Sequence, residues 1–173
     1  MIFRKLKATE IECRVGTINE KGLTLLLYKD ARCDMNLLDE SGLKWKREHQ
    51  LINNKLFCTV SIYDPEIKEW VSRQDVGVES NTEATKGEAS DSFKRACFNW
   101  GVGRELYTAP FVWVSADKYD VRMNKSGKPT TYDKFFVEKI KYDDVTGEII
   151  GLAIKNKSTD KRVFLYQKES HEN

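Results

Sequence analysis

The chain has 173 residues, of which 40% are hydrophobic and 32% are charged, with only three prolines and ten glycines. This composition is typical of a folded domain and excludes a disordered or fibrous chain. The formal net charge of +2 does not by itself indicate a nucleic-acid-binding protein. No apolar run approaches the roughly twenty residues that span a bilayer, and no signal-peptide core follows the basic N-terminus, so the expected location is the cytoplasm.

The first part of the chain predicts two strands and a helix. Residues 6–28 alternate apolar and polar side chains on either side of a polar turn at residues 19–22, which is typical of a strand pair. Residues 29–41 have a helical spacing of apolar positions. Gly42 is well placed to end this helix, because glycine readily adopts the left-handed conformation of a helix C-terminus.

Three further strands are expected before the longest helix. Residues 43–49 form the first, and a turn at residues 53–55 leads into the second at 57–63. The third, at 70–78, follows a loop that contains Pro65. Tryptophan, valine, isoleucine and phenylalanine in these segments suit the half-buried surface of a sheet.

The next helix has the clearest sequence pattern. Ser80 and Glu83 have the spacing of a capping box, in which the two side chains bind otherwise unpaired amides at a helix N-terminus. The helix is expected to run to about residue 100 and to stop at Gly101. Five apolar residues fall on one stripe of it: Ala89, Phe93, Ala96, Cys97 and Trp100.

The last third of the chain predicts strands and a basic loop. Residues 110–114 have an extended pattern, the loop at 119–134 is rich in lysine, and residues 135–142 and 149–155 form a second hairpin. The tail from Lys168 is polar and expected to fray. The class is therefore α+β, in a single domain over residues 1–173.

Common catalytic and metal-binding patterns are missing from the sequence. The four cysteines are far apart and the chain has two histidines, so we expect free thiols, no metal and no cofactor. The glycine-rich lysine loop of ATPases is absent, and Gly101 and Gly103 follow a helix, as expected of a helix stop. Acidic residues within 75–91 leave a metal-dependent nuclease open as an alternative: Asp75, Glu79, Glu88 and Asp91.

The bases are unevenly distributed along the chain. Residues 75–91 contain one base, Lys86, whereas residues 94–128 are rich in lysine and arginine. Lys94 and Arg95 are adjacent on the polar side of the long helix, where flexible cations can reach phosphates without reading a base sequence. On composition alone, solvated surface charge is the more common explanation of the same pair. Phe98 on that side is a candidate for contact with another subunit or for stacking on a base.

Three segments together resemble a known family. They are D-V-G-V-E-S at 75–80, K-G-E-A-S-D-S-F-K-R-A at 86–96 and W-G-V-G-R-E-L-Y at 100–107. They resemble the Rad-fifty-two single-strand annealing family, and most of all its bacteriophage Sak-like branch. The resemblance covers about residues 8–114. It implies a β-β-β-α core with an additional N-terminal strand and helix, to which this chain adds the C-terminal β-hairpin.

The resemblance also implies a function and a set of residues. It implies a ring-like homo-oligomer that binds single-stranded DNA and anneals complementary strands without ATP in phage homologous recombination, and that is not an enzyme. Lys94 and Arg95 match the family's two helix bases that contact the DNA backbone, and Arg14 matches a groove arginine. Eukaryotic members have another base where this chain has Phe98. The candidate DNA-binding residues are then Lys94, Arg95, Arg14, Arg104 and Lys86.

The expected partners are single-stranded DNA and further copies of the chain. A single-strand-binding protein is a further candidate partner. The recombinase that eukaryotic members of the family bind is not expected as a partner. Two alternative functions stay open. One is a single-strand DNA-binding protein that does not anneal, and the other is the metal-dependent nuclease.

Overall fold

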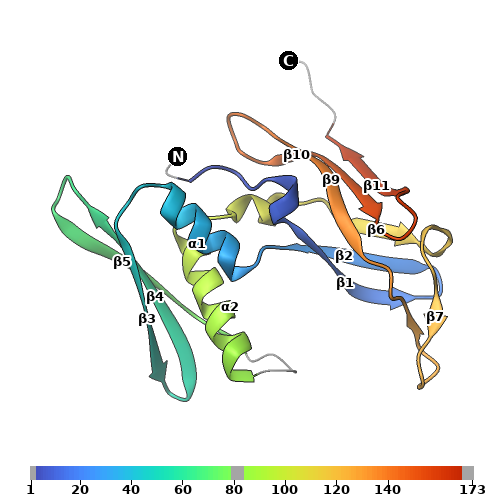
Figure 1. Ribbon diagram of the computed structural model, residues 1–173, viewed down its shortest axis with the longest axis horizontal. Helices are drawn as coiled ribbons and strands as arrows, with labels where there is room; N and C mark the ends of the chain where they lie inside the picture. Colours follow the sequence, from blue (N-terminus) through green and yellow to red (C-terminus); the bar gives the residue numbers. More distant parts are fainter. Residues whose placement is uncertain (1–2, 79–83, 169–173) are drawn as a thin grey trace. The chain divides into compact units, whose positions relative to one another are not determined.

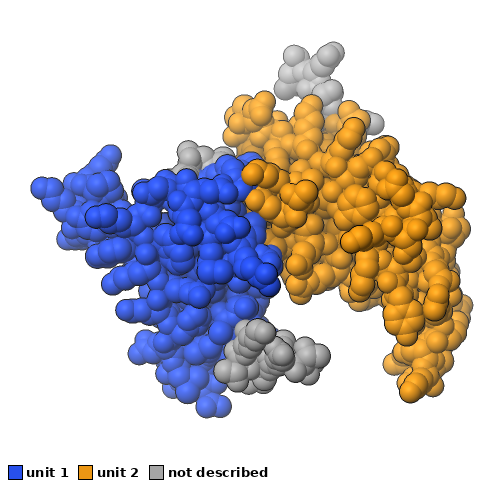
Figure 2. Space-filling view, in the orientation of Figure 1, with its two compact units in different colours: residues 1–5, 30–104 blue, residues 6–29, 105–173 orange. Residues whose placement is uncertain are grey.

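The computed structural model describes residues 3–78 and 84–168, and for residues 84–86 it describes the backbone alone (Figure 1). The fold is α+β, as the sequence predicts. The chain forms two compact units, coloured separately in Figure 2. Unit 1 comprises residues 1–5 and 30–104, and unit 2 comprises residues 6–29 and 105–173. The predicted capping box of Ser80 and Glu83 lies outside the described residues.

Unit 1 contains one helix, then three strands and then a second helix. Its elements are α1 (Ala31–Glu40), β3 (Trp45–Ile52), β4 (Lys55–Asp64), β5 (Glu69–Val76) and α2 (Ala84–Asn99). The strands form an antiparallel sheet in the order β3-β4-β5, which confirms the predicted β-β-β-α arrangement. Asn53 and Asn54 make the β3–β4 turn with φ angles of 50° and 62°, a conformation that asparagine tolerates well.

Helix α1 lies within the predicted range 29–41 and ends before Gly42, as the sequence predicts. The Asp30 side chain accepts a hydrogen bond of 2.7 Å from the amide of Cys33, which satisfies one of the free donors of the first turn. At the other end, Gly42 has a φ of 71°, a conformation that costs glycine no steric energy.

Unit 2 is a six-stranded antiparallel sheet with short helical turns. Its strand order is β11-β10-β9-β1-β2-β6. The strands are β1 (Glu12–Asn19), β2 (Gly22–Tyr28), β6 (Val112–Ser115), β9 (Phe135–Tyr142), β10 (Ile149–Asn156) and β11 (Arg162–Gln167). The turns are η1 (Ala8–Glu10), η2 (Arg104–Thr108) and η3 (Ala116–Lys118), with Arg104 belonging to unit 1. A small hairpin, β7 (Arg122–Met123) with β8 (Pro129–Thr130), occupies the predicted basic loop.

Beyond the basic loop, the C-terminal part contains one strand more than the sequence predicts. The expected hairpin of β9 and β10 is present, and β11 pairs with β10 to extend it. Lys118, which follows β6, donates from Nζ to the carbonyl of Val163 in β11 at 3.2 Å. The segment that follows β6, at one end of the strand order, is therefore linked by a hydrogen bond to β11 at the other end. The expected 8–114 boundary coincides with neither unit, since β1, β2 and β6 belong with the C-terminal strands.

The four cysteines are free, and three of them are buried. Burial raises the pKa of the Cys13 thiol to about 12 and that of Cys58 to about 11, the latter against a lowering effect of Arg47. None of the described helices is long and apolar enough to cross a membrane.

We predict slow modification of Cys13 and Cys58 in the native protein. With an unshifted pKa of 9.0, about a tenth of a thiol is ionised at pH 8. The raised pKa values reduce this fraction by roughly 1,000-fold for Cys13 and roughly 100-fold for Cys58, and the thiolate gains population only as the pH approaches 11–12. Reaction with a disulfide reagent at pH 8, followed by peptide mapping, measures each site. Rapid labelling of Cys58 without denaturant would contradict its burial.

Candidate nucleic-acid interface

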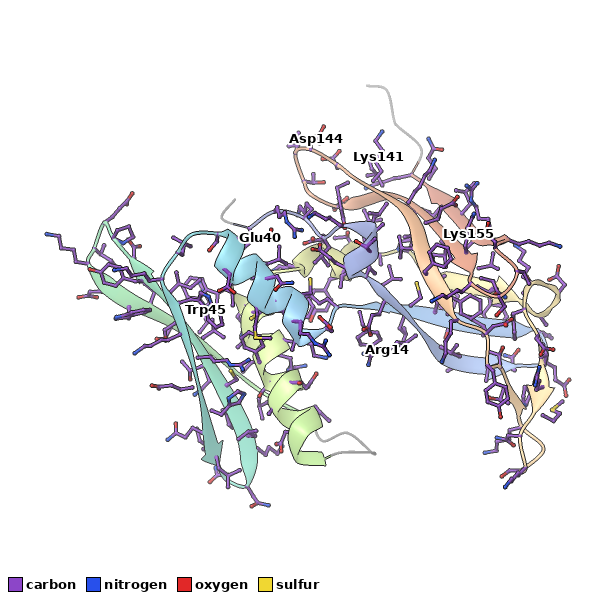
Figure 3. The ribbon with its side chains drawn as sticks, viewed as in Figure 1. Arg14, Glu40, Trp45, Lys141, Asp144 and Lys155 are labelled. Atoms are coloured by element: carbon purple, nitrogen blue, oxygen red, sulfur yellow. The ribbon has the colours of Figure 1, made fainter. Side chains whose placement is uncertain are left out.

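Helix α2 is fixed on the sheet of unit 1 by its apolar stripe. Phe93, Ala96 and Cys97 are fully buried, as the helical spacing predicts. The Phe93 ring stacks on Trp45, which is labelled in Figure 3, with 6.2 Å between the ring centroids. The indole of Trp100 donates a hydrogen bond of 2.9 Å to the carbonyl of Val60 in β4. The polar side of the helix is therefore held in a defined orientation.

The two candidate cations of α2 have different surroundings. Lys94 is half-buried and makes no hydrogen bond or ion pair with any described residue. The Arg95 side chain is 45% exposed, and its Nε lies 3.2 Å from an oxygen of Asp75 in β5. Because this ion pair is partly exposed, it contributes little to stability and leaves much of the guanidinium open to an incoming anion.

Arg104 has a structural contact that the sequence did not predict. Its Nη2 donates to the carbonyls of Phe98 and Asn99 at 2.7 and 3.0 Å, and its Nε donates to the carbonyl of Phe98 at 3.1 Å. These carbonyls belong to the last turn of α2, whose acceptors have no partner within the helix. The guanidinium therefore caps the helix C-terminus, which explains Arg104 without a DNA contact.

The remaining two candidates lie elsewhere. Lys86 is in the first turn of α2, and its side chain lies outside the described residues. Arg14 is in β1 of unit 2, whereas the other four candidates are in unit 1. Its guanidinium pairs with Glu12 at 2.7 Å and lies 5.0 Å from the centre of the Tyr28 ring (Figure 3).

The structure adds a cation that sequence reasoning missed. Arg73 in β5 is exposed, and its guanidinium lies 4.9 Å from the centre of the Trp100 ring. Arg73 and Asp75 are two residues apart on one strand and so face the same side of the sheet. Since Asp75 pairs with Arg95, two arginines and one carboxylate gather beside α2. Because side chains alternate between the two faces of a strand, the sequence of β5 alone could have placed Arg73 on the same face as Asp75.

The described acidic residues of the nuclease alternative have hydrogen-bond partners around α2. Glu88 accepts a hydrogen bond from the amide of Leu56 at 2.8 Å, and Asp91 accepts one from the amide of Val78 at 3.1 Å. Asp75 binds Arg95 and Asn99. Among the described residues, no group of three histidine, cysteine or acidic side chains is placed to hold a metal ion. Glu79 lies outside the described residues.

Gly77 explains part of the D-V-G-V-E-S segment in structural terms. A Cβ atom at this position would lie 2.2 Å from the carbonyl oxygen of Glu88, closer than side-chain carbons approach other atoms. The amide of Gly77 also donates to the carbonyl of Leu56 at 3.0 Å, so the backbone is held in place. The chain crosses α2 here at a distance that only glycine permits.

We predict that Gly77→Ala lowers the free energy of unfolding by about 1–3 kcal/mol, the usual cost of forcing an added carbon into a packed site. Urea unfolding followed by tryptophan fluorescence measures the change. Val145→Ala, at a hairpin tip where Val145 is 92% exposed, is the control and should stay within about 0.5 kcal/mol of the parent. Equal stability of Gly77→Ala and the parent would contradict the close crossing.

Comparison with protein-family models, with curated proteins and with solved structures found no match to this chain. The chemistry of the interface therefore rests on its own residues. An unpaired lysine and two partly exposed arginines beside one helix can bind phosphate oxygens through charge-assisted hydrogen bonds, without reading bases.

Proposed function

We propose that this chain binds single-stranded DNA along α2 and anneals complementary strands without ATP. The observation that carries the proposal is the pair of cations on helix α2, within a segment that resembles the Rad-fifty-two annealing family: Lys94 is half-buried and the Arg95 side chain is 45% exposed. Arg73, on the neighbouring strand, adds a third cation to this surface.

The proposed mechanism needs no catalytic group. Cations hold one strand by its phosphates, which leaves the bases free to pair with a second strand. Neutralised phosphates lower the repulsion between the two strands and release bound counterions. Stacking of the new duplex supplies about 1.4 kcal/mol for each base-pair step, so annealing proceeds downhill without a nucleotide cofactor. Phage homologous recombination in a bacterial cytoplasm is the setting that the resemblance favours.

An annealing assay tests this function directly. Two complementary strands with donor and acceptor dyes are mixed with the protein, without ATP and with a chelator that removes magnesium. We expect pairing to become much faster than in buffer alone. Tight binding of one strand with no faster pairing would favour the non-annealing alternative. Loss of full-length strand on adding magnesium would favour the nuclease.

We also propose that the chain assembles into a ring-like homo-oligomer. Trp70 is 44% exposed, packs edge-on against Tyr63 at 5.5 Å and has the ammonium of Lys46 over its ring at 5.0 Å. Tryptophan is enriched at protein–protein interfaces, which makes Trp70 a candidate for contact with another copy of the chain. Light scattering should find an assembly many times the 20.1 kDa of one chain, and a stable monomer at micromolar concentration would exclude the ring.

A further inference from the structure

The outer face of the unit 2 sheet combines positive charge with exposed rings. Five strands, β1, β2, β9, β10 and β11, carry five cations and two carboxylates, a net charge of +3. The cations are Arg14, Lys139, Lys141, Lys155 and Arg162, and the carboxylates are Glu12 and Glu138. Both carboxylates are already paired, Glu12 with Arg14 and Glu138 with Arg162 and Lys155. Lys139 and Lys141 make no ion pair or hydrogen bond with any described residue.

Strand register places two of the rings in one row across this face. Phe136 of β9 lies opposite Glu12 of β1, and Glu12 lies opposite Tyr28 of β2. Residues directly opposite each other in an antiparallel sheet point to the same side. Since neighbouring strands are about 4.8 Å apart, the backbones of Phe136 and Tyr28 are roughly 10 Å apart. Both rings are more than a third exposed, at 37% and 38%.

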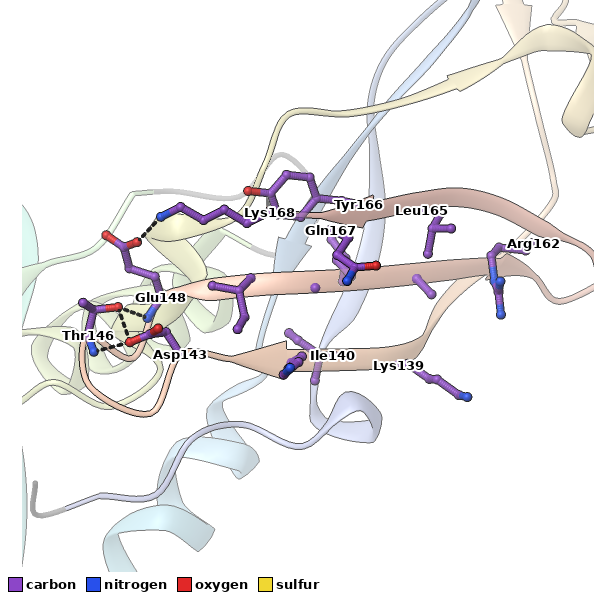
Figure 4. Close-up of a pocket in the computed structure, with 15 residues that line it drawn as sticks. Lys139, Ile140, Asp143, Thr146, Glu148, Arg162, Leu165, Tyr166, Gln167 and Lys168 are labelled. Carbon is purple, nitrogen blue, oxygen red and sulfur yellow. Dashed lines mark hydrogen bonds and ion pairs between the residues drawn. The ribbon is translucent and has the colours of Figure 1, made fainter. Parts of the chain in front are cut away.

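A groove lies over β9, β10 and β11, and Lys139, three residues after Phe136, is part of its lining (Figure 4). Its volume is about 860 Å³. The small residues Gly151 and Ala153 of β10 form the floor of the groove. The longer side chains opposite them on the two neighbouring strands form its walls: Lys141 and Lys139 on β9, and Gln167 and Leu165 on β11. The two unpaired lysines therefore line one wall of the groove.

We propose that this outer sheet face binds single-stranded nucleic acid, with bases stacked on Tyr28 and Phe136 and phosphates held by Lys139 and Lys141. Exposed rings among cations on a sheet favour this occupant over an acidic peptide, because every base has a π-face that stacks on a ring. Arg14 over Tyr28 adds a cation at the same place. The inference rests on the proposed single-strand binding and assigns a part in it to the C-terminal strands, which lie beyond the segment of family resemblance.

Two pairs of substitutions in the full chain test this face with a fluorescent oligothymidine. Phe136→Leu and Tyr28→Leu should each weaken binding by about 5- to 150-fold, the range for loss of one stacked base, while leaving the salt dependence unchanged. Lys139→Ser with Lys141→Ser should instead flatten the log–log salt slope by about 1.4, at about 0.7 for each lost phosphate contact.

Matched controls stay within unit 2. Phe111→Leu removes a ring that is 75% exposed outside the five strands, and Lys157→Ser with Lys161→Ser removes the same charge from exposed positions between β10 and β11. Both controls should bind as the parent does. Photocrosslinking with iodouracil in the strand, followed by peptide mapping, should label Tyr28 or Phe136.

The outcomes separate this inference from the proposed function. If the parent binds the strand but the sheet-face variants bind equally well, the inference is wrong and the α2 interface remains. If the parent protein binds no single-stranded DNA, both this inference and the proposed function are wrong. If the lysine variant loses binding of polyglutamate but keeps that of oligothymidine, the groove is a site for an acidic peptide, which also overturns the inference.

Discussion

The double variant Lys94→Ala, Arg95→Ala is expected to bind single-stranded DNA at least about 25-fold more weakly at 0.1 M salt. The logarithm of the binding constant falls linearly with the logarithm of the salt concentration, and two lost phosphate contacts make this slope shallower by about 1.4. At 0.1 M salt the binding constant is then lower by a factor of about 10 to the power 1.4. The proposed oligomer should remain intact, because neither side chain belongs to the buried stripe of Phe93, Ala96 and Cys97. Fluorescence anisotropy at several salt concentrations measures the affinity and the slope together.

Asp75→Asn is the control that should act in the opposite direction. It removes the carboxylate that pairs with Arg95 at 3.2 Å and frees the guanidinium, while an amide oxygen can still accept from Asn99. We expect tighter binding of the strand than in the parent. Arg14→Ala should behave like the helix variant, but with a smaller loss. An unchanged salt slope in the double variant, or its dissociation into monomers, would make Lys94 and Arg95 structural residues.

Phe93→Ala is expected to lower the free energy of unfolding by about 3–5 kcal/mol, the usual cost of removing a buried phenylalanine ring. The ring is fully buried, stacks on Trp45 and has the Arg47 guanidinium 4.6 Å from its centre. Such a loss is a large share of the 5–15 kcal/mol that stabilises a typical domain. Urea unfolding gives the value, and secondary structure measured by circular dichroism shows whether the variant still folds.

Phe111→Ala is the matched control for this substitution. Phe111 is 75% exposed, so its truncation removes little buried surface and should change stability by no more than about 0.5 kcal/mol. A second variant, Phe93→Leu, retains most of the buried volume and should lose less than Phe93→Ala. Similar losses for the Phe93 and Phe111 variants would mean that Phe93 does not anchor α2 to the sheet.

Most of the individual elements could be predicted from local patterns in the sequence. The turn at Asn53 and Asn54, the end of α1 at Gly42 and the buried stripe of α2 all depend on residues close together in the chain. Each is set by backbone preference or by the period of a helix or strand, which can be read within a short window. Strand β11, Arg162–Gln167, was not predicted, and its place in the sheet depends on pairing with β10.

The candidate site was predictable only in part. Adjacency in sequence selected Lys94 and Arg95, yet the structure gives them different surroundings, because successive residues of a helix point about 100° apart. Arg73 and Asp75 reach α2 through sheet pairing, and Arg104 turns back to the carbonyls of Phe98 and Asn99. The period of two in β5 places Arg73 and Asp75 on one face of the strand, but no local pattern indicates which residues of α2 they contact.

By itself, the sequence determined the α+β class, the order along the chain of the longer strands other than β11 and the face of α2 that is buried, since these follow from periodicity and turn chemistry. Only the tertiary structure decided that β1 pairs with β9, which aligns Glu12 with Phe136 more than a hundred residues away. It also decided that β1 and β2 join the C-terminal strands in one sheet. Such pairing depends on backbone hydrogen bonds and side-chain packing between distant segments, and these are available only once the whole chain has folded.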